Sequence, residues 1–230
     1  CKYRRIVVNI VVVLLSFVMY IINTVSKHVF SSLFVMDPRL KHPFTALVVG
    51  PTQAGKTVFT FKLISEAQRM IYPPPEKIIY CYGEYQDTFT AYPNVTFIEG
   101  LPDMGQFDGK ERILLVLDDL ISETNDDVER IFTRVSHHKN ISVIHLSQNL
   151  FYKSKQNRTI SLNSHYIVLF KNPRDVNQVA TLGRQMYAGR SNFLVDSFRD
   201  ATQRPYGYLL LDLKPQTDDK FRVRTNIFPD

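Results

Sequence analysis

Eight consecutive residues follow the pattern G-x-x-x-x-G-K-T, which is typical of loops that bind nucleotide phosphates. They are Gly50, Pro51, Thr52, Gln53, Ala54, Gly55, Lys56 and Thr57. In such a loop the glycines let the backbone approach the phosphates, the lysine reaches the β- and γ-phosphates, and the threonine hydroxyl holds Mg²⁺. We therefore predict that residues 50–57 bind ATP, that Lys56 is catalytic, and that Thr57 is a magnesium ligand.

The residues on either side of this loop predict the elements that position it. Residues 44–49 form a short apolar run, which indicates a buried strand. Residues 58–64 carry apolar side chains at helical spacing, and this pattern continues to about Met70. A loop between a strand and a helix suits anion binding, because the backbone N–H groups and the dipole of the helix N-terminus face the phosphates.

A second acidic motif follows another apolar run. Residues 112–117 are almost entirely apolar, which predicts a strand buried on both faces, and Asp118 and Asp119 come directly after it. Carboxylates in such a place are costly unless they hold a cation. We expect this strand to lie beside the first, with Asp118 as a magnesium ligand and Asp119 polarising the attacking water. Capping of the next turn is the alternative for Asp119.

Two amide residues, Gln148 and Asn149, follow a third strand, which is predicted over residues 141–146. In doubly wound sheets, ligands bind at the carboxyl ends of the strands. A neutral amide there can contact the γ-phosphate or the nucleophilic water without adding negative charge. We assign this role to Gln148 first and to Asn149 second, with capping of the loop as the alternative.

An arginine from a neighbouring subunit often completes the charge stabilisation in phosphoryl transfer. Arg134, in the helix predicted before the Gln148 strand, is our first candidate. Arg174 and Arg184 are the alternatives. Each could also be an ordinary solvated or salt-bridged arginine.

The order of apolar patterns after Met36 indicates an α/β fold. Strand patterns alternate with helical ones, which predicts a mainly parallel central sheet flanked by helices. Further strands are predicted over residues 77–82, 94–99, 165–170 and 206–213, with 221–226 as a hairpin partner of the last. Helices are predicted over residues 126–136, 175–186 and 192–199.

The first 35 residues form a separate segment of different composition. Residues 6–22 are apolar apart from two positions, a length that suits a short transmembrane helix or a signal-peptide core. More positive charge precedes this segment than follows it, which would place the phosphate loop outside the cell. We therefore interpret residues 1–35 as an extension upstream of an internal start at Met36, and 36–230 as an ATPase domain. A genuine membrane anchor at 6–22 is the alternative.

Composition limits the classes of partner and compartment. The chain has 230 residues and a formal net charge of +6, which fits a polyanionic partner. Its two cysteines cannot form a disulfide framework, and a reducing intracellular setting is expected.

Taken together, these motifs resemble the viral genome-packaging ATPases of the FtsK/HerA superfamily. The resemblance rests on residues 50–57, 115–120 and 136–151, and continues through 158–163, 170–175 and 204–208. The closest versions occur in poxvirus-like large DNA viruses and in Polinton (Maverick) or adintovirus-like elements. That family usually has glutamate where this chain has Asp119, so the shorter side chain leaves the identity of the base open.

The resemblance implies a P-loop NTPase with a RecA/FtsK-like core that hydrolyses ATP with Mg²⁺. It further implies a homo-oligomeric ring that drives double-stranded DNA into a capsid through a capsid or portal-like partner. The expected location is the host nucleus or cytoplasm, or the virion. A membrane partner is not expected unless residues 6–22 form an anchor.

Three other functions remain open on sequence grounds. Residues 114–120 also resemble the second motif of innate-immune signalling NTPases, which act as nucleotide-gated switches. A small-molecule kinase is a second alternative, although no arginine-rich lid segment is evident. A degenerate protein that binds ATP without turnover is the third.

Overall fold

The computed structural model describes residues 37–229 except 119, 121–124, 151–154 and 175. The chain divides into two units, Cys1–Pro38 and Arg39–Asp230, and the fold below is that of the second. The apolar segment 6–22, the proposed start at Met36 and the predicted base Asp119 lie outside the described residues. Within the described part, no helix is both long and apolar enough to cross a membrane.

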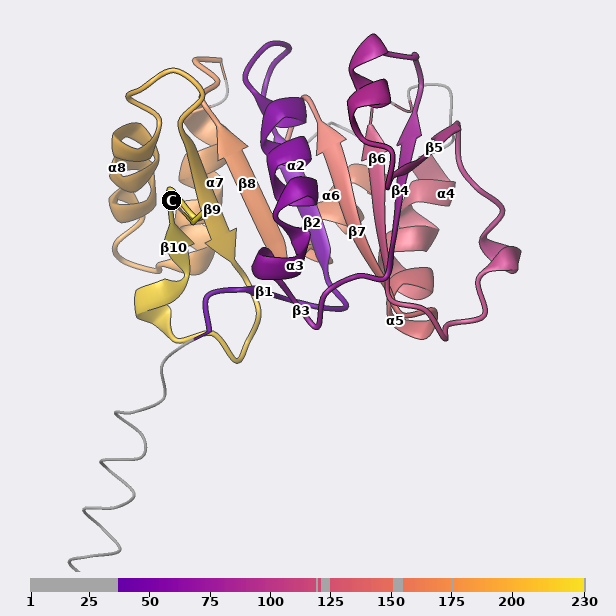
Figure 1. The fold of residues 1–230 in the computed structure, drawn as a ribbon. Coiled ribbons are helices and arrows are strands. Elements are labelled where there is room, and N and C mark those ends of the chain that lie inside the picture. Colours follow the sequence, from indigo (N-terminus) through magenta and orange to yellow (C-terminus); the bar gives the residue numbers. More distant parts are fainter. Residues whose placement is uncertain (1–36, 119, 121–124, 151–154, 175, 230) are drawn as a thin grey trace, which may run out of the picture. The chain divides into compact units, whose positions relative to one another are not determined.

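An eight-stranded sheet forms the centre of the second unit (Figure 1). In sheet order its strands are β10 (Val223–Arg224), β9 (Tyr208–Asp212), β8 (Tyr166–Phe170), β2 (Thr45–Val49), β7 (Ile141–Ser147), β6 (Ile113–Asp118), β4 (Lys77–Tyr82) and β5 (Thr96–Glu99). The six strands from β8 to β5 are parallel. Only β9 and β10 pair antiparallel within this described sheet. The predicted α/β fold with a mainly parallel sheet is confirmed.

Helices cover both faces of this sheet. On one face lie α2 (Lys56–Ser65) and α3 (Ala67–Met70), and on the other lie α4 (Asn125–Arg130), α6 (Lys155–Leu162), α7 (Val176–Met186) and α8 (Asn192–Ala201). A π-helical turn (Ile131–Val135) joins α4 to α5 (Ser136–His138). Short 3-10 turns span Asp87–Ala91, Met104–Gln106 and Asp219–Phe221, and β1 (Leu40–Lys41) pairs with β3 (Ile71–Tyr72).

Double coverage explains why the central strands are largely apolar on both faces. All five residues of β2 and of β8 are buried, as are the first five of β6. A strand with helices on both faces has no solvent-facing positions, so its sequence does not alternate between apolar and polar. Within β6, burial is lost only at Asp118, its last residue, where the strand reaches the edge of the sheet.

One topological prediction is wrong. The strand that ends in Asp118 does not lie beside the strand that precedes the phosphate loop, because β7 pairs with both and separates them. The run of apolar residues in β6 identifies a buried strand but does not specify its neighbours. The sequence prediction also misses α6, whose segment is largely polar.

Candidate nucleotide-binding site

The phosphate loop joins the carboxyl end of β2 to the first residue of α2. Gly55 has a φ of 105°, in the left-handed region that favours glycine, and it precedes the helix without a side-chain cap. The first turn of α2 contains no acidic residue. The positive end of the helix is therefore not neutralised by a carboxylate of its own, which suits an anion.

The Lys56 ammonium lies across the loop. Its Nζ donates to the carbonyl oxygens of Gly50 at 2.7 Å and Pro51 at 3.1 Å. The amide of Ala54 donates in turn to the Pro51 carbonyl at 3.2 Å. The loop is thus folded around Lys56, the one charged side chain that its motif contains.

Gly50 is required by packing. A Cβ at this position would lie 2.7 Å from the Cβ of Phe170, at the end of β8. The Gly50 amide donates to the carbonyl of Ser147, the last residue of β7, at 3.2 Å. The start of the loop is therefore held between the ends of the two strands that flank β2.

Asp118 lies at the same edge of the sheet as the loop. Its Oδ2 accepts a 2.5 Å hydrogen bond from the Tyr80 hydroxyl, which comes from the neighbouring strand β4. Tyr80 is fully buried, and this burial together with the nearby Asp118 carboxylate raises the pKa of its hydroxyl. The tyrosine therefore stays protonated and orients the carboxylate.

The strand register brings Asp118 toward the loop although the strands are not adjacent. Val48 pairs with Leu146, and Leu146 pairs with Asp118, so the three residues form one row across β2, β7 and β6. Two strand spacings separate the ends of the row, roughly 10 Å. Val48 and Leu146 pack on the face that α2 covers, which is also the face of Tyr80. Asp118 is thus on the same side of the sheet as Lys56.

Gln148 and Asn149 follow β7, the strand between the other two. Gln148 is exposed and Asn149 is half-buried. The turn is stabilised by Ser147, whose hydroxyl donates to the Asn149 carbonyl at 2.9 Å. Since Ser147 also accepts from Gly50, the two predicted amides come directly after a residue that contacts the phosphate loop.

The three candidate arginines lie in different places. Arg134 is exposed in the π-helical turn before α5, which Figure 1 shows at the edge of the sheet opposite to the phosphate loop. Arg174 is exposed shortly after β8, at the loop's own edge, and Arg184 is exposed on α7. The turn that carries Arg134 packs on the face of the sheet opposite to α2, so its predicted role calls for a neighbouring subunit.

Sequence reasoning missed Tyr80 and Tyr206. Tyr80 lies inside an apolar strand, where a tyrosine is commonly a core residue, and no spacing rule connects it to Asp118. Tyr206 is exposed and adopts a φ of 61°, and its ring lies where a Cβ on Gly55 would approach Cδ1 to 3.0 Å. Pro205 and Gly207, on either side of Tyr206, are the sequence signals of a turn there.

The described residues contain no group of three or more histidine, cysteine or acidic side chains that could hold a metal ion. Thr57 and Asp118 are oxygen donors, which suit Mg²⁺, and this ion commonly takes only one or two protein ligands beside phosphate oxygens. The residues present therefore fit a nucleotide-bound magnesium ion.

The fold is similar to that of a solved viral protein, the genome packaging NTPase B204 from Sulfolobus turreted icosahedral virus 2. In its complex with AMP, B204 matches with a TM-score of 0.50 and 11% sequence identity, over 83% of this chain and 98% of B204. Its complex with ATP-gammaS gives a TM-score of 0.50 and 13% identity with the same coverage. No family model matches the chain, and no curated protein matches it in sequence. At this identity the likeness shows that the chain has the fold of an NTPase.

Proposed function

We propose that this protein is an ATP-hydrolysing motor that moves double-stranded DNA into a viral or element capsid. The observation that carries the proposal is the arrangement of three strand ends at one edge of the sheet. β2 leads into the phosphate loop, β6 ends in Asp118, and β7 between them ends next to Gln148. The fold likeness to a packaging NTPase supports the same function.

The proposed reaction is attack of water on the γ-phosphorus of ATP, with breakage of the bond to the oxygen shared with the β-phosphate. Lys56 and the N–H groups at the start of α2 bind the phosphates and stabilise the charge on the leaving group. A magnesium ion held by Thr57 and Asp118 would neutralise the phosphate oxygens. Gln148 orients the water, and Asp119 accepts its proton.

Movement of DNA requires contacts with the DNA and with a neighbouring subunit. The net charge of +6 favours a polyanion, and the charge-stabilising arginine is proposed to come from a neighbour in a homo-oligomeric ring. Arg134 suits this role because it is exposed and its turn packs on the face of the sheet opposite to α2. A capsid or portal-like protein is the proposed docking partner of the ring.

The deciding experiment is an ATPase assay of the purified chain with and without linear double-stranded DNA. We expect Mg²⁺-dependent turnover that DNA stimulates, with the stimulation falling as salt rises, because DNA binding releases counterions. Lys56→Ala should abolish turnover with and without DNA. Turnover that is slow and indifferent to DNA would contradict the motor and favour a nucleotide-gated switch.

Substitutions of Asp118 and Asp119 should have different effects on turnover in the same assay. Asp118→Asn is expected to raise the Mg²⁺ concentration required for turnover, because it removes a charged ligand. Asp119→Asn should leave ATP binding unchanged and lower kcat, because the proton acceptor is lost. If Asp119→Asn retains the wild-type kcat, Asp119 is a cap and another group accepts the proton.

A further inference from the structure

A hollow of about 580 Å³ opens beside the phosphate loop. Gly55 of the loop forms part of its wall, and most of the remainder is aromatic. The aromatic side chains are Phe59, Phe170, Tyr206, Tyr208 and Phe228. A concave site of this size with aromatic lining residues is typical of a pocket for a small organic ligand.

We propose that this hollow binds the base of a purine nucleotide whose phosphates lie in residues 50–57. The inference rests on the proposed nucleotide-binding function, and it names the part of the substrate that the loop does not contact. Gly55 belongs both to the loop and to the wall of the hollow. A nucleotide held by its phosphates therefore extends past Gly55 into the aromatic surface.

Two apolar side chains at the hollow are uncovered. Val58 on α2 is 71% exposed and Tyr206 is 69% exposed, and both line the hollow. Tyr206 is also held in the left-handed region, which is uncommon for a bulky residue and often marks a functional position. The turn is tight, because a Cβ on Gly207 would lie 2.4 Å from the carbonyl oxygen of Ala201. This geometry places the Tyr206 ring against Gly55 while leaving most of the side chain open to a ligand.

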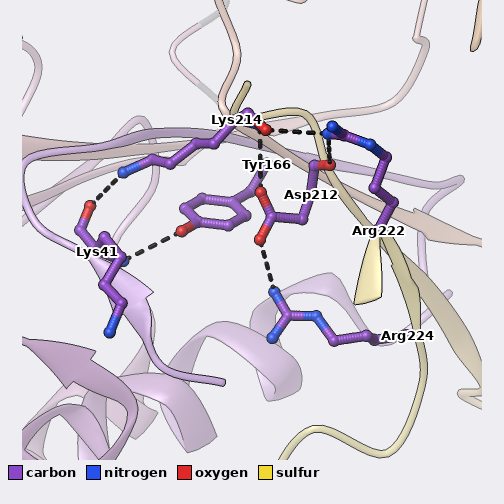
Figure 2. A network of polar contacts seen from close by, with 6 residues as sticks. All are labelled: Lys41, Tyr166, Asp212, Lys214, Arg222 and Arg224. Atoms are coloured by element: carbon purple, nitrogen blue, oxygen red, sulfur yellow. Dashed lines mark hydrogen bonds and ion pairs between the residues drawn. The ribbon is translucent and has the colours of Figure 1, made fainter. Parts of the chain in front are cut away.

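The far wall is built by the end of the chain, and a polar network holds that segment in place (Figure 2). Arg224 on β10 binds the buried Asp212 carboxylate of β9 at 3.1 Å. Arg222 donates to the Lys214 carbonyl at 2.9 Å, and the Lys214 ammonium donates to the Lys41 carbonyl at 2.6 Å. The final residues are thus tied to β9 and to the start of the second unit.

From this anchor the chain passes over Tyr208. The Thr225 hydroxyl donates to the Tyr208 carbonyl at 2.8 Å, and the Ile227 amide donates to the Tyr208 hydroxyl at 3.0 Å. These bonds place Phe228 against Phe59, with ring centroids 5.2 Å apart. The aromatic wall is therefore formed by protein contacts alone and does not require the ligand to assemble it.

The chemistry of the lining indicates which part of a base it recognises. Among the described lining residues, Asn226 and Lys62 are the polar side chains besides the tyrosines, and the Lys62 ammonium lies 4.8 Å above the Phe228 ring. Stacking on aromatic faces depends on ring area and tolerates different base edges. We therefore expect ATP and GTP to bind similarly, and both to bind more tightly than CTP or UTP.

Calorimetric titration of the full chain with Mg²⁺ and four probes tests this inference. The probes are ATP, GTP, CTP and inorganic tripolyphosphate, which carries the phosphates without a base. We expect Tyr206→Asn to weaken the binding of ATP at least tenfold and to leave the affinity for tripolyphosphate unchanged. Asparagine is chosen because it tolerates the left-handed backbone, and Tyr206→Phe should bind ATP like the wild type. The matched control is Phe193→Ala, an exposed aromatic on the opposite face of the sheet.

The outcomes separate this inference from the proposed function. Lys56→Ala should abolish the binding of both ATP and tripolyphosphate, because the Lys56 side chain contacts the phosphates. If Tyr206→Asn binds ATP like the wild type, if it weakens both probes equally, or if CTP binds as tightly as ATP, the base pocket is wrong while the phosphate site stands. If the wild type binds neither ATP nor tripolyphosphate, the nucleotide-binding function fails as well.

Discussion

At the scale of single residues, the hydrogen bond from Tyr80 to Asp118 is the contact that most directly sets the geometry of the site. We predict that Tyr80→Phe lowers kcat roughly 10- to 100-fold, as is usual when a group that orients a metal ligand is removed. The requirement for Mg²⁺ should rise in parallel. Steady-state turnover measured over a Mg²⁺ titration checks both effects.

A matched control for this change lies on the same strand. Tyr82, two residues further along β4, packs on the same face through ring contacts with Tyr85 and Phe89. Tyr82→Phe should keep the wild-type kcat and Mg²⁺ requirement. Equal losses in the two variants would mean that Tyr80 acts through packing and does not orient Asp118.

His145 is a second residue whose environment has a measurable consequence. It lies on β7 against Phe132, its Nδ1 is buried without a hydrogen-bond partner among the described residues, and burial lowers its pKa from 6.5 to about 4. The backbone of Leu117 favours the protonated ring but does not offset the burial. Below pH 6.5 the unfolded chain takes up a proton that the folded chain does not, so folding stability falls as the pH is lowered toward 4.

We predict that His145→Leu removes part of this pH dependence. The contribution is at most roughly 3 kcal/mol, since one pKa unit corresponds to about 1.4 kcal/mol. Urea unfolding at pH 7 and pH 4.5 measures it, and the difference between the two pH values should be smaller in the variant. His138→Gln, a change at an exposed histidine, should leave the difference unaltered. An unchanged difference in His145→Leu would show that His145 is protonated in the folded protein.

At the scale of elements, the short strand β10 depends on one nearly buried ion pair. The side chains of Asp212 and Arg224 are 8% and 16% exposed. Removing one member of such a pair leaves the other charge without its partner and typically costs about 3–5 kcal/mol. We predict a loss of this size in the free energy of unfolding for Asp212→Asn, measured by urea denaturation.

The comparison for this prediction is an exposed pair on α8. Asp196 and Arg199 are 70% and 68% exposed and lie 3.7 Å apart. Asp196→Asn should change stability by less than about 1 kcal/mol, because solvent screens such pairs. A small effect of Asp212→Asn as well would mean that the backbone pairing of β9 with β10 holds the end of the chain unaided.

At the scale of the whole molecule, the proposed ring makes the active site a property of two subunits. We predict that Lys56→Ala and Arg134→Ala, each inactive alone, recover partial ATPase activity when mixed where rings assemble. A mixed ring places an intact phosphate loop against an intact Arg134 from the next subunit. Such an arginine is worth roughly 10³–10⁵ in rate, so even partial recovery should be measurable.

Sedimentation shows whether the mixture assembles. If rings form and no ratio of the two variants restores turnover, Arg134 is not the arginine in question. Arg174 then becomes the first candidate, because it follows β8 at the edge where the phosphate loop lies. The same mixing experiment with Arg174→Ala distinguishes the two.

The amino-acid sequence by itself determined the phosphate loop, the buried strands and the positions of Asp118 and Gln148. These are local properties, since a glycine-bounded loop before an amphipathic helix and a long apolar run are visible within a few residues. The role of Asp118 as a magnesium ligand remains a sequence prediction. The role of Asp119 likewise remains a sequence prediction.

Only the tertiary structure decided which strands are neighbours and which side chains meet. β7 lies between β2 and β6. Apolar periodicity does not predict this order, because strands of similar length and burial can pair in any order. The contact of Tyr80 with Asp118 spans two strands, and the hollow beside Gly55 combines α2, β8 and the end of the chain. Such contacts depend on strand order and register, which long-range packing sets and short-range sequence patterns do not encode.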